Sequence, residues 1–233
     1  MSALVQLSEA LTTYTTTVDR DGMALEKVAV SSLLLFARSN HYDFNLNVLC
    51  TEGHQVDCMV QGGPTVELWT DVESFPWSSP NHRPPLSAVV TDLITRLNNA
   101  SPDCRGVVFR PTNQHNMCGD VYGLFRKVDG RGYALLVLQC KDWFIAAGKL
   151  EKKWDESRKE LPTNHLGDLD LKDDGLIVTP IFLLFSSNGL SENKPLQKNC
   201  GVVSILSMRN WLPTASYACE MAQKLQQIYQ PSQ

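Results

Sequence analysis

The sequence predicts an α/β fold in which helices flank a central mixed β-sheet, and two observations favour this class. Apolar residues recur at helical spacing over residues 23–38 and again over residues 86–97. Between residues 105 and 208, short apolar runs alternate with turn residues and with a further helical pattern. Such an order predicts strands that pair with their neighbours along the chain and helices that cover the sheet.

The composition is that of a globular protein with a substantial core, since 43% of the residues are hydrophobic and 20% are charged. A chain of 233 residues suits one domain. We expect a single domain over 1–233, with a core at about 22–38 and 105–229 and an insertion at about 40–104. The net charge of −4 excludes a surface that is basic throughout, but it leaves room for a local basic patch.

The cysteines and the N-terminus indicate an intracellular protein, cytoplasmic or nuclear. Seven cysteines form no CxxC pair, which argues against a structural zinc site and a disulfide framework. The first residues lack the basic and apolar regions of a signal peptide. No apolar run approaches the roughly 18 residues of a transmembrane helix, so we expect no membrane partner.

The elements follow from local patterns. The first helix, 23–38, places Leu25, Val28, Ala29, Ser32 and Phe36 on one face, and Asp21 is a candidate N-cap. The stretch 3–20 is rich in threonine and shows no clear period. The remaining expected elements are strands at 44–50, 56–60 and 66–69, a helix at 86–97, a strand at 107–109, a hairpin of 120–128 with 133–139, a helix at 144–159, strands at 176–185 and 202–208, and a helix at 213–229.

Polar residues end a strand that is otherwise apolar on both faces. The run 133–138 continues directly into Gln139, Cys140 and Lys141. Because side chains alternate along a strand, Gln139 and Lys141 point to the same side. Counting back through the hairpin turn places Asp120 beside them. A carboxylate, an amide oxygen and an ammonium group suit metal-assisted phosphodiester hydrolysis, in which oxygen ligands hold Mg²⁺ and the lysine stabilises negative charge.

This pattern resembles the PD-(D/E)xK nuclease superfamily, the restriction-endonuclease-like fold with an αβββαβ core. The matching residues are Asp120 and then Gln139-Cys140-Lys141, with glutamine in place of the usual glutamate. The resemblance implies Mg²⁺ or Mn²⁺ held by Asp120, Gln139 and the backbone carbonyl of Cys140, with Lys141 as the catalytic lysine. It implies Glu26 as an outer or second-metal ligand, and nucleic acid as substrate, DNA rather than RNA. An uncharged Gln139 should weaken metal binding.

Other residues carry weaker expectations. Lys149, Lys152 and Lys153 either contact a nucleic-acid backbone or form a solvated helix face, and His115 is a candidate phosphate contact. A cysteine hydrolase using Cys118 and His115 is a third alternative.

The main alternative is a catalytically inactive nuclease-fold module with a binding or assembly role. In that case Asp120 only begins a strand after a turn, and Gln139 and Lys141 only mark the emergence of the next strand into solvent. The oligomeric state stays open, a homodimer included.

Overall fold

The computed structural model describes the first part of the predicted core and shorter pieces of the rest. The described residues are 3–16, 22–40, 42–50, 56–72, 86–101, 103–112, 119–141, 177–186, 199–204 and 208.

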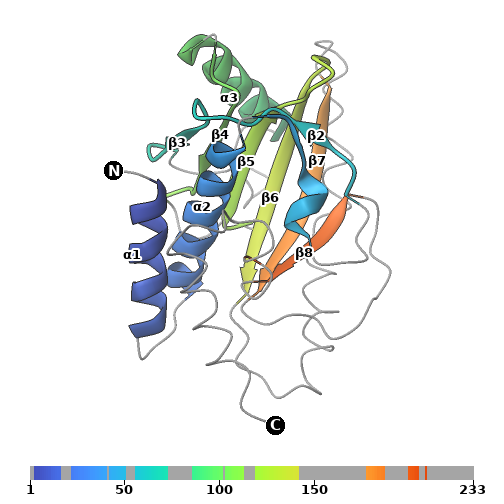
Figure 1. The fold of residues 1–233 in the computed structure, drawn as a ribbon. Coiled ribbons are helices and arrows are strands. Elements are labelled where there is room, and N and C mark those ends of the chain that lie inside the picture. Colours follow the sequence, from blue (N-terminus) through green and yellow to red (C-terminus); the bar gives the residue numbers. More distant parts are fainter. Residues whose placement is uncertain are drawn as a thin grey trace, which may run out of the picture.

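A mixed sheet forms the centre of the molecule, as the sequence predicts (Figure 1). Within the described residues it has six strands in the order β3-β4-β5-β6-β7-β8. Only β5 is antiparallel to the other strands. The C-terminal ends of β4, β6 and β7 and the N-terminal end of β5 therefore meet at the same end of the strands, which forms one edge of the sheet. The strand bounds are β3 Glu67–Trp69, β4 Gly106–Phe109, β5 Val121–Arg126, β6 Tyr133–Lys141, β7 Val178–Ser186 and β8 Cys200–Ser204.

Helices cover both faces of this sheet and give a three-layer arrangement. The helices α1 (Ala3–Thr16) and α2 (Gly22–Ser39) share one buried cluster with one sheet face. Helix α3 (Leu86–Ala100) shares a second cluster with the opposite face. The N-terminus of α2 lies at the same lower end of the view as the tip of β6 (Figure 1).

The predicted first helix is confirmed, and its apolar face is the reason for its position. Leu25, Val28, Ala29, Ser32 and Phe36 are all buried, at 4% exposure or less. Burial of each large apolar side chain contributes about 1.5–3 kcal/mol. Burial of this face fixes the rotation of α2 about its axis. It therefore also determines which residues in the first turns of α2 lie near the end of β6.

The helix α1 was not expected from the sequence. Leu7, Ala10 and Leu11 are buried at the i, i+3 and i+4 spacing of one helix face, which packs on α2. The hydroxyls of Thr12 and Thr13 donate to backbone carbonyls four residues earlier, so these residues satisfy their polar groups inside the helix. Packing against α2 overrides the low helix propensity of the threonines.

The predicted strand 44–50 is wrong over most of its length. Only β1 (Phe44–Asn45) is extended, and it pairs with β2 (Met59–Val60). Leu46–Leu49 forms a 3₁₀ turn, because the Asn45 side chain accepts a hydrogen bond from the Asn47 amide, 2.9 Å away. Leu46 and Leu49 are buried three residues apart, as 3₁₀ geometry requires.

The segment 40–104 shares the core with the rest of the chain. It supplies the edge strand β3, which pairs parallel to β4. Val56, Cys58, Val60 and Val66 belong to the same buried cluster as α2, while Trp69 and the apolar face of α3 belong to the cluster on the opposite face. Its division from the core as an insertion stays a prediction.

The helix 86–97 and the strands at 107–109, 176–185 and 202–208 are confirmed as elements, with shifted ends. The expected helices at 144–159 and 213–229, and the candidate cap Asp21, lie outside the described residues. No helix in the described part of the chain is both long and apolar enough to cross a membrane.

Candidate functional site

The hairpin of β5 and β6 sets the position of the candidate site. Its register pairs Val121 with Leu138, and one residue further out the Asp120 amide donates to the Leu138 carbonyl at 2.8 Å. Strand β6 continues to Lys141, where it still pairs with β7. Asp120 is therefore the residue directly before β5, and it lies beside Gln139 and Cys140 near the end of β6.

The Asp120 carboxylate makes two short contacts with the end of β6. Its Oδ2 accepts a hydrogen bond from the Cys140 backbone amide at 2.7 Å and another from Gln139 Nε2 at 2.9 Å. Hydrogen bonds to a charged acceptor are about twice as strong as neutral ones and hold its orientation. Because Gln139 donates through its nitrogen, its oxygen is the atom of this side chain that a cation would use.

The alternation of side chains along a strand determines where the Gln139, Cys140 and Lys141 side chains of β6 point. Tyr133, Leu135 and Val137 belong to the cluster on the α3 face, so alternation puts Gln139 and Lys141 on that same face. The Cys140 side chain is buried on the α2 face. The Cys140 amide points at Asp120, and the N–H and C=O of one strand residue point the same way, so the Cys140 carbonyl faces this edge as well.

An ion pair between Arg110 and Glu26 lies near Asp120, on the α2 side of the sheet. Arg110 follows directly after β4, and its Nε donates to Oε2 of Glu26 in α2. The two side chains are partly buried, 28% and 18% exposed respectively. Glu26 and Arg110 are both near enough to Asp120 to change its pKa.

Burial raises the pKa of the Asp120 carboxyl from 3.8 to about 6. The Cys140 amide opposes this rise, the negative charge of Glu26 adds to it, and the positive charges of Lys141 and Arg110 oppose it. A carboxyl group with such a pKa is half protonated in mildly acidic solution. Any cation that uses it must compete with a proton there.

We expect this raised pKa to lower the stability of the metal-free protein as the pH rises. The unfolded carboxyl titrates near 3.8 and the folded one near 6, so between these values the folded state binds more protons. The free energy of unfolding therefore falls through this window, by on the order of 2–3 kcal/mol, and the loss is complete above it. Urea denaturation in EDTA across the window measures it.

Asp120→Asn is the matched control for this titration. Its amide has no charge to titrate, so the variant should lack this part of the pH slope, while the other carboxyl groups contribute equally to both proteins. Equal slopes for the two proteins would contradict the assignment of the raised pKa to Asp120.

The donor set at the edge fits a small, oxygen-preferring cation. The Asp120 carboxylate, the Gln139 amide oxygen and the Cys140 carbonyl are all hard oxygen ligands of the type that Mg²⁺ and Mn²⁺ accept. The set is poor in charge, however. Within the described residues, no three His, Cys, Asp or Glu side chains are grouped closely enough to hold a metal ion.

The sequence predicts that Asp120, Gln139, Cys140 and Lys141 lie together, and Asp120, Gln139 and Cys140 are in direct contact. Arg110 is an additional residue near the site that the sequence pattern was not used to predict. The signal was a charged residue directly after an apolar strand, in the same pattern as Gln139 to Lys141. The other candidates, His115, Cys118, Lys149, Lys152 and Lys153, lie outside the described residues.

The described cysteines are not activated nucleophiles. Burial raises the pKa of the thiols of Cys58, Cys104, Cys140 and Cys200, and it raises that of Cys50 to about 12. Thiols in such surroundings are inert.

Comparison with known proteins assigns no family. No family model matches the chain, and neither the curated proteins nor the solved structures contain a significant match.

Proposed function

We propose that this protein is a metal-dependent nuclease that hydrolyses phosphodiester bonds of nucleic acid, DNA rather than RNA. The observation that carries the proposal is the Asp120 carboxylate, which the Gln139 amide and the Cys140 backbone hold at the end of a buried strand. Lys141 is the next residue on the face of Gln139. After the elements between α2 and β4, the strands β4, β5, β6 and β7 follow in order, with β5 antiparallel and β6 parallel to β7; this supports the restriction-endonuclease-like core.

Each residue has a defined part in this proposal. Asp120, Gln139 and the Cys140 carbonyl would hold Mg²⁺ or Mn²⁺, and Glu26 would be an outer ligand on the α2 side of the sheet. A bound ion of this kind would polarise the phosphate and make water a stronger nucleophile at neutral pH. The Lys141 ammonium orients the attacking water and stabilises the additional negative charge on the phosphate. The buried residues of β6 that precede Gln139 fix the strand in the sheet, and this holds Gln139, Cys140 and Lys141 in place beside Asp120.

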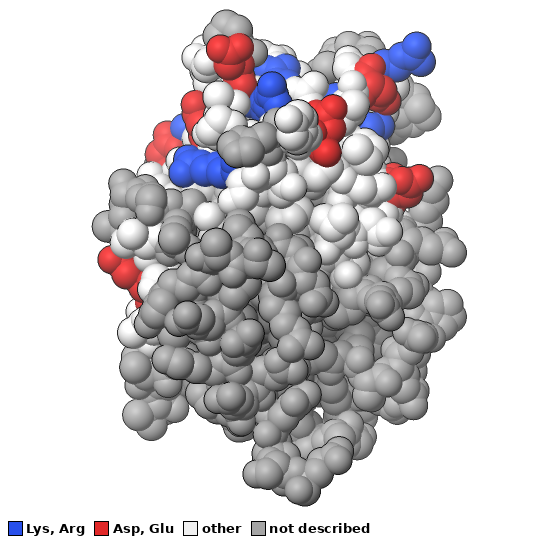
Figure 2. All heavy atoms as spheres, in the orientation of Figure 1, with Lys and Arg blue, Asp and Glu red and all other residues white. Residues whose placement is uncertain are grey.

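A catalytically inactive module of the same fold is the second candidate, and one observation favours it. Only one carboxylate, Asp120, belongs directly to the donor set, and Arg110 neutralises Glu26. On the face shown in Figure 2, the described positive and negative side chains are interspersed and form no basic patch among themselves. In this alternative the contacts of Asp120 serve only to close the end of the hairpin.

Cleavage assays separate the two candidates. Purified protein should nick supercoiled plasmid with Mg²⁺ or Mn²⁺ and should lose that activity in EDTA. Parallel substrates of single-stranded DNA and RNA test the preference for DNA. A Lys141→Ala preparation, purified in the same way, controls for contaminating nucleases. Absence of cleavage on every substrate at saturating metal would support the inactive module.

A further inference from the structure

A groove with a mixed polar and apolar lining lies on the α2 side of the sheet, and Arg110 connects it to the surroundings of Asp120. The groove has a volume of about 440 Å³ between α1, α2 and the ends of β3 and β4. Positions spaced at i, i+3 and i+4 on each helix form its walls, so the groove follows from how the two helices face each other. Hydrogen-bonding side chains lining it include Gln6, Thr13, Lys27, Ser31, Arg110 and Thr112.

Arg110 connects the groove to the site. Its side chain lines the groove, and its guanidinium is held by Glu26, whose charge acts on Asp120. Lys27 follows Glu26 on α2, and neighbouring residues of a helix point about 100° apart. Lys27 therefore lines the groove while Glu26 faces Arg110. With Arg110 paired, the groove holds Lys27 against one acid, Glu9, and is close to neutral.

We infer that this groove binds a single strand of nucleic acid beside the scissile phosphate, with Arg110 and Lys27 as its phosphate contacts, and that Glu26 withholds Arg110 until a divalent cation enters the site. The inference rests on the proposed function for the location of the cleaved bond. The size of the groove supports one strand, because about 440 Å³ is a small-ligand volume that admits a nucleotide or two.

Charge explains why the metal and the strand should bind together. A cation held by Asp120 would attract the Glu26 carboxylate and so weaken its ion pair with the Arg110 guanidinium. Arg110 then presents planar, bidentate donors to the groove, an arrangement suited to a phosphate group. Because coupling between two ligands is reciprocal, the strand should tighten metal binding by the same factor as the metal tightens strand binding.

The test is fluorescence anisotropy with a short fluorescein-labelled oligothymidylate, in EDTA and in Ca²⁺, with a gel to confirm that the probe is intact. For the wild type we expect Ca²⁺ to tighten binding by about fivefold or more. Arg110→Gln should bind the probe as weakly in Ca²⁺ as in EDTA. Lys27→Gln should weaken binding in both conditions, since it removes one phosphate contact.

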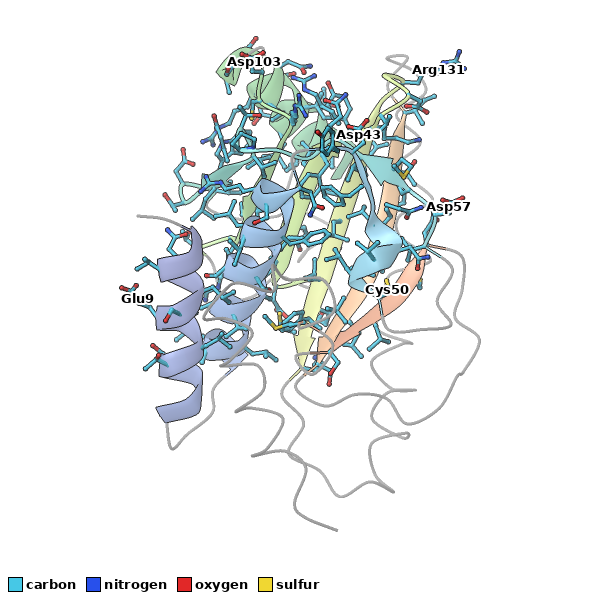
Figure 3. The ribbon with its side chains drawn as sticks, viewed as in Figure 1. Glu9, Asp43, Cys50, Asp57, Asp103 and Arg131 are labelled. Carbon is cyan, nitrogen blue, oxygen red and sulfur yellow. The ribbon has the colours of Figure 1, made fainter. Side chains whose placement is uncertain are left out.

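Glu26→Gln should change the affinity for the probe in the opposite direction to Arg110→Gln. It frees Arg110 without a cation, so binding in EDTA should rise toward the wild-type level in Ca²⁺. A folding defect cannot produce both the loss in Arg110→Gln and the gain in Glu26→Gln. Arg131→Gln is the matched control, because Arg131 is exposed at the hairpin turn, at the opposite end of the sheet (Figure 3). It should bind as the wild type does.

The outcomes distinguish this inference from the proposed function. If the wild type cleaves nucleic acid but Arg110→Gln and Arg131→Gln bind the probe equally well, the groove is not the binding site and the nuclease proposal stands. If the expected binding pattern occurs without any cleavage, the groove inference stands and the nuclease proposal fails. Failure of Glu26→Gln to strengthen binding in EDTA would overturn the role of Glu26.

Discussion

Replacing Lys141 with alanine should lower metal-dependent cleavage by roughly 10²–10³-fold, the usual effect of removing one group that stabilises transition-state charge. Lys141 is not in the proposed donor set, so the affinity of the site for Mg²⁺ or Mn²⁺ should change little. It ends β6, partly exposed, and its removal leaves the backbone pairing with β7 intact. Single-turnover cleavage at saturating metal measures the rate, and isothermal titration calorimetry measures metal binding.

Asp120→Asn is the informative comparison for this variant. It removes the only formal charge among the three proposed inner ligands, so it should lose metal affinity and cleavage together. A Lys141→Ala protein that cleaves at the wild-type rate would contradict the catalytic assignment. If both variants lost metal binding equally, Lys141 would be a structural partner of the carboxylate and not a catalytic group.

Gln139→Glu should increase the affinity for Mg²⁺ by about tenfold or more, because ligand charge sets the affinity of oxygen sites. The same change should destabilise the metal-free protein by about 1–3 kcal/mol. It replaces a donor 2.9 Å from Asp120 Oδ2 with a second carboxylate, and two like charges in a partly buried site repel each other. Saturating Mg²⁺ should reverse that loss. Calorimetry and denaturant unfolding, with EDTA or Mg²⁺, test both parts.

Gln61→Glu is the matched control for this prediction. Gln61 is also a partly buried glutamine, and it donates to the Lys127 carbonyl near the far end of the hairpin. The identical chemical change there should leave the affinity for Mg²⁺ unaltered. Equal metal responses in the two variants would show that added charge acts at long range and not as a ligand.

The contact between Asp120 and Gln139 could be predicted from the sequence because a short turn fixes a hairpin register. The turn at 129–132 has glycines at positive φ, Gly130 at 67° and Gly132 at 131°, and a Cβ on Gly132 would lie 2.0 Å from the Ile177 carbonyl. With that turn in place, counting residues outward pairs the two strands, and Asp120 reaches Gln139 without any knowledge of the rest of the fold.

Contacts that depend on packing could not be predicted in this way. Helix α1 depends on α2 for the burial of Leu7 and Leu11, and its second half is rich in threonine, a weak helix former. The pairing of Glu26 with Arg110 joins residues 84 positions apart, through α2 lying across the sheet. Nothing local to Arg110 indicates that partner, so the charge balance of the site became visible only with the fold.

The most direct measurement of the central claim is anomalous diffraction from crystals soaked in Mn²⁺. We expect one strong peak at the end of β6, within about 2–2.5 Å of Asp120 Oδ, Gln139 Oε1 and the Cys140 carbonyl oxygen. The peak should disappear in Asp120→Asn crystals soaked in the same way. A fully occupied manganese ion elsewhere, or no peak at this edge at saturating Mn²⁺, would contradict the claim that these three groups form a metal centre.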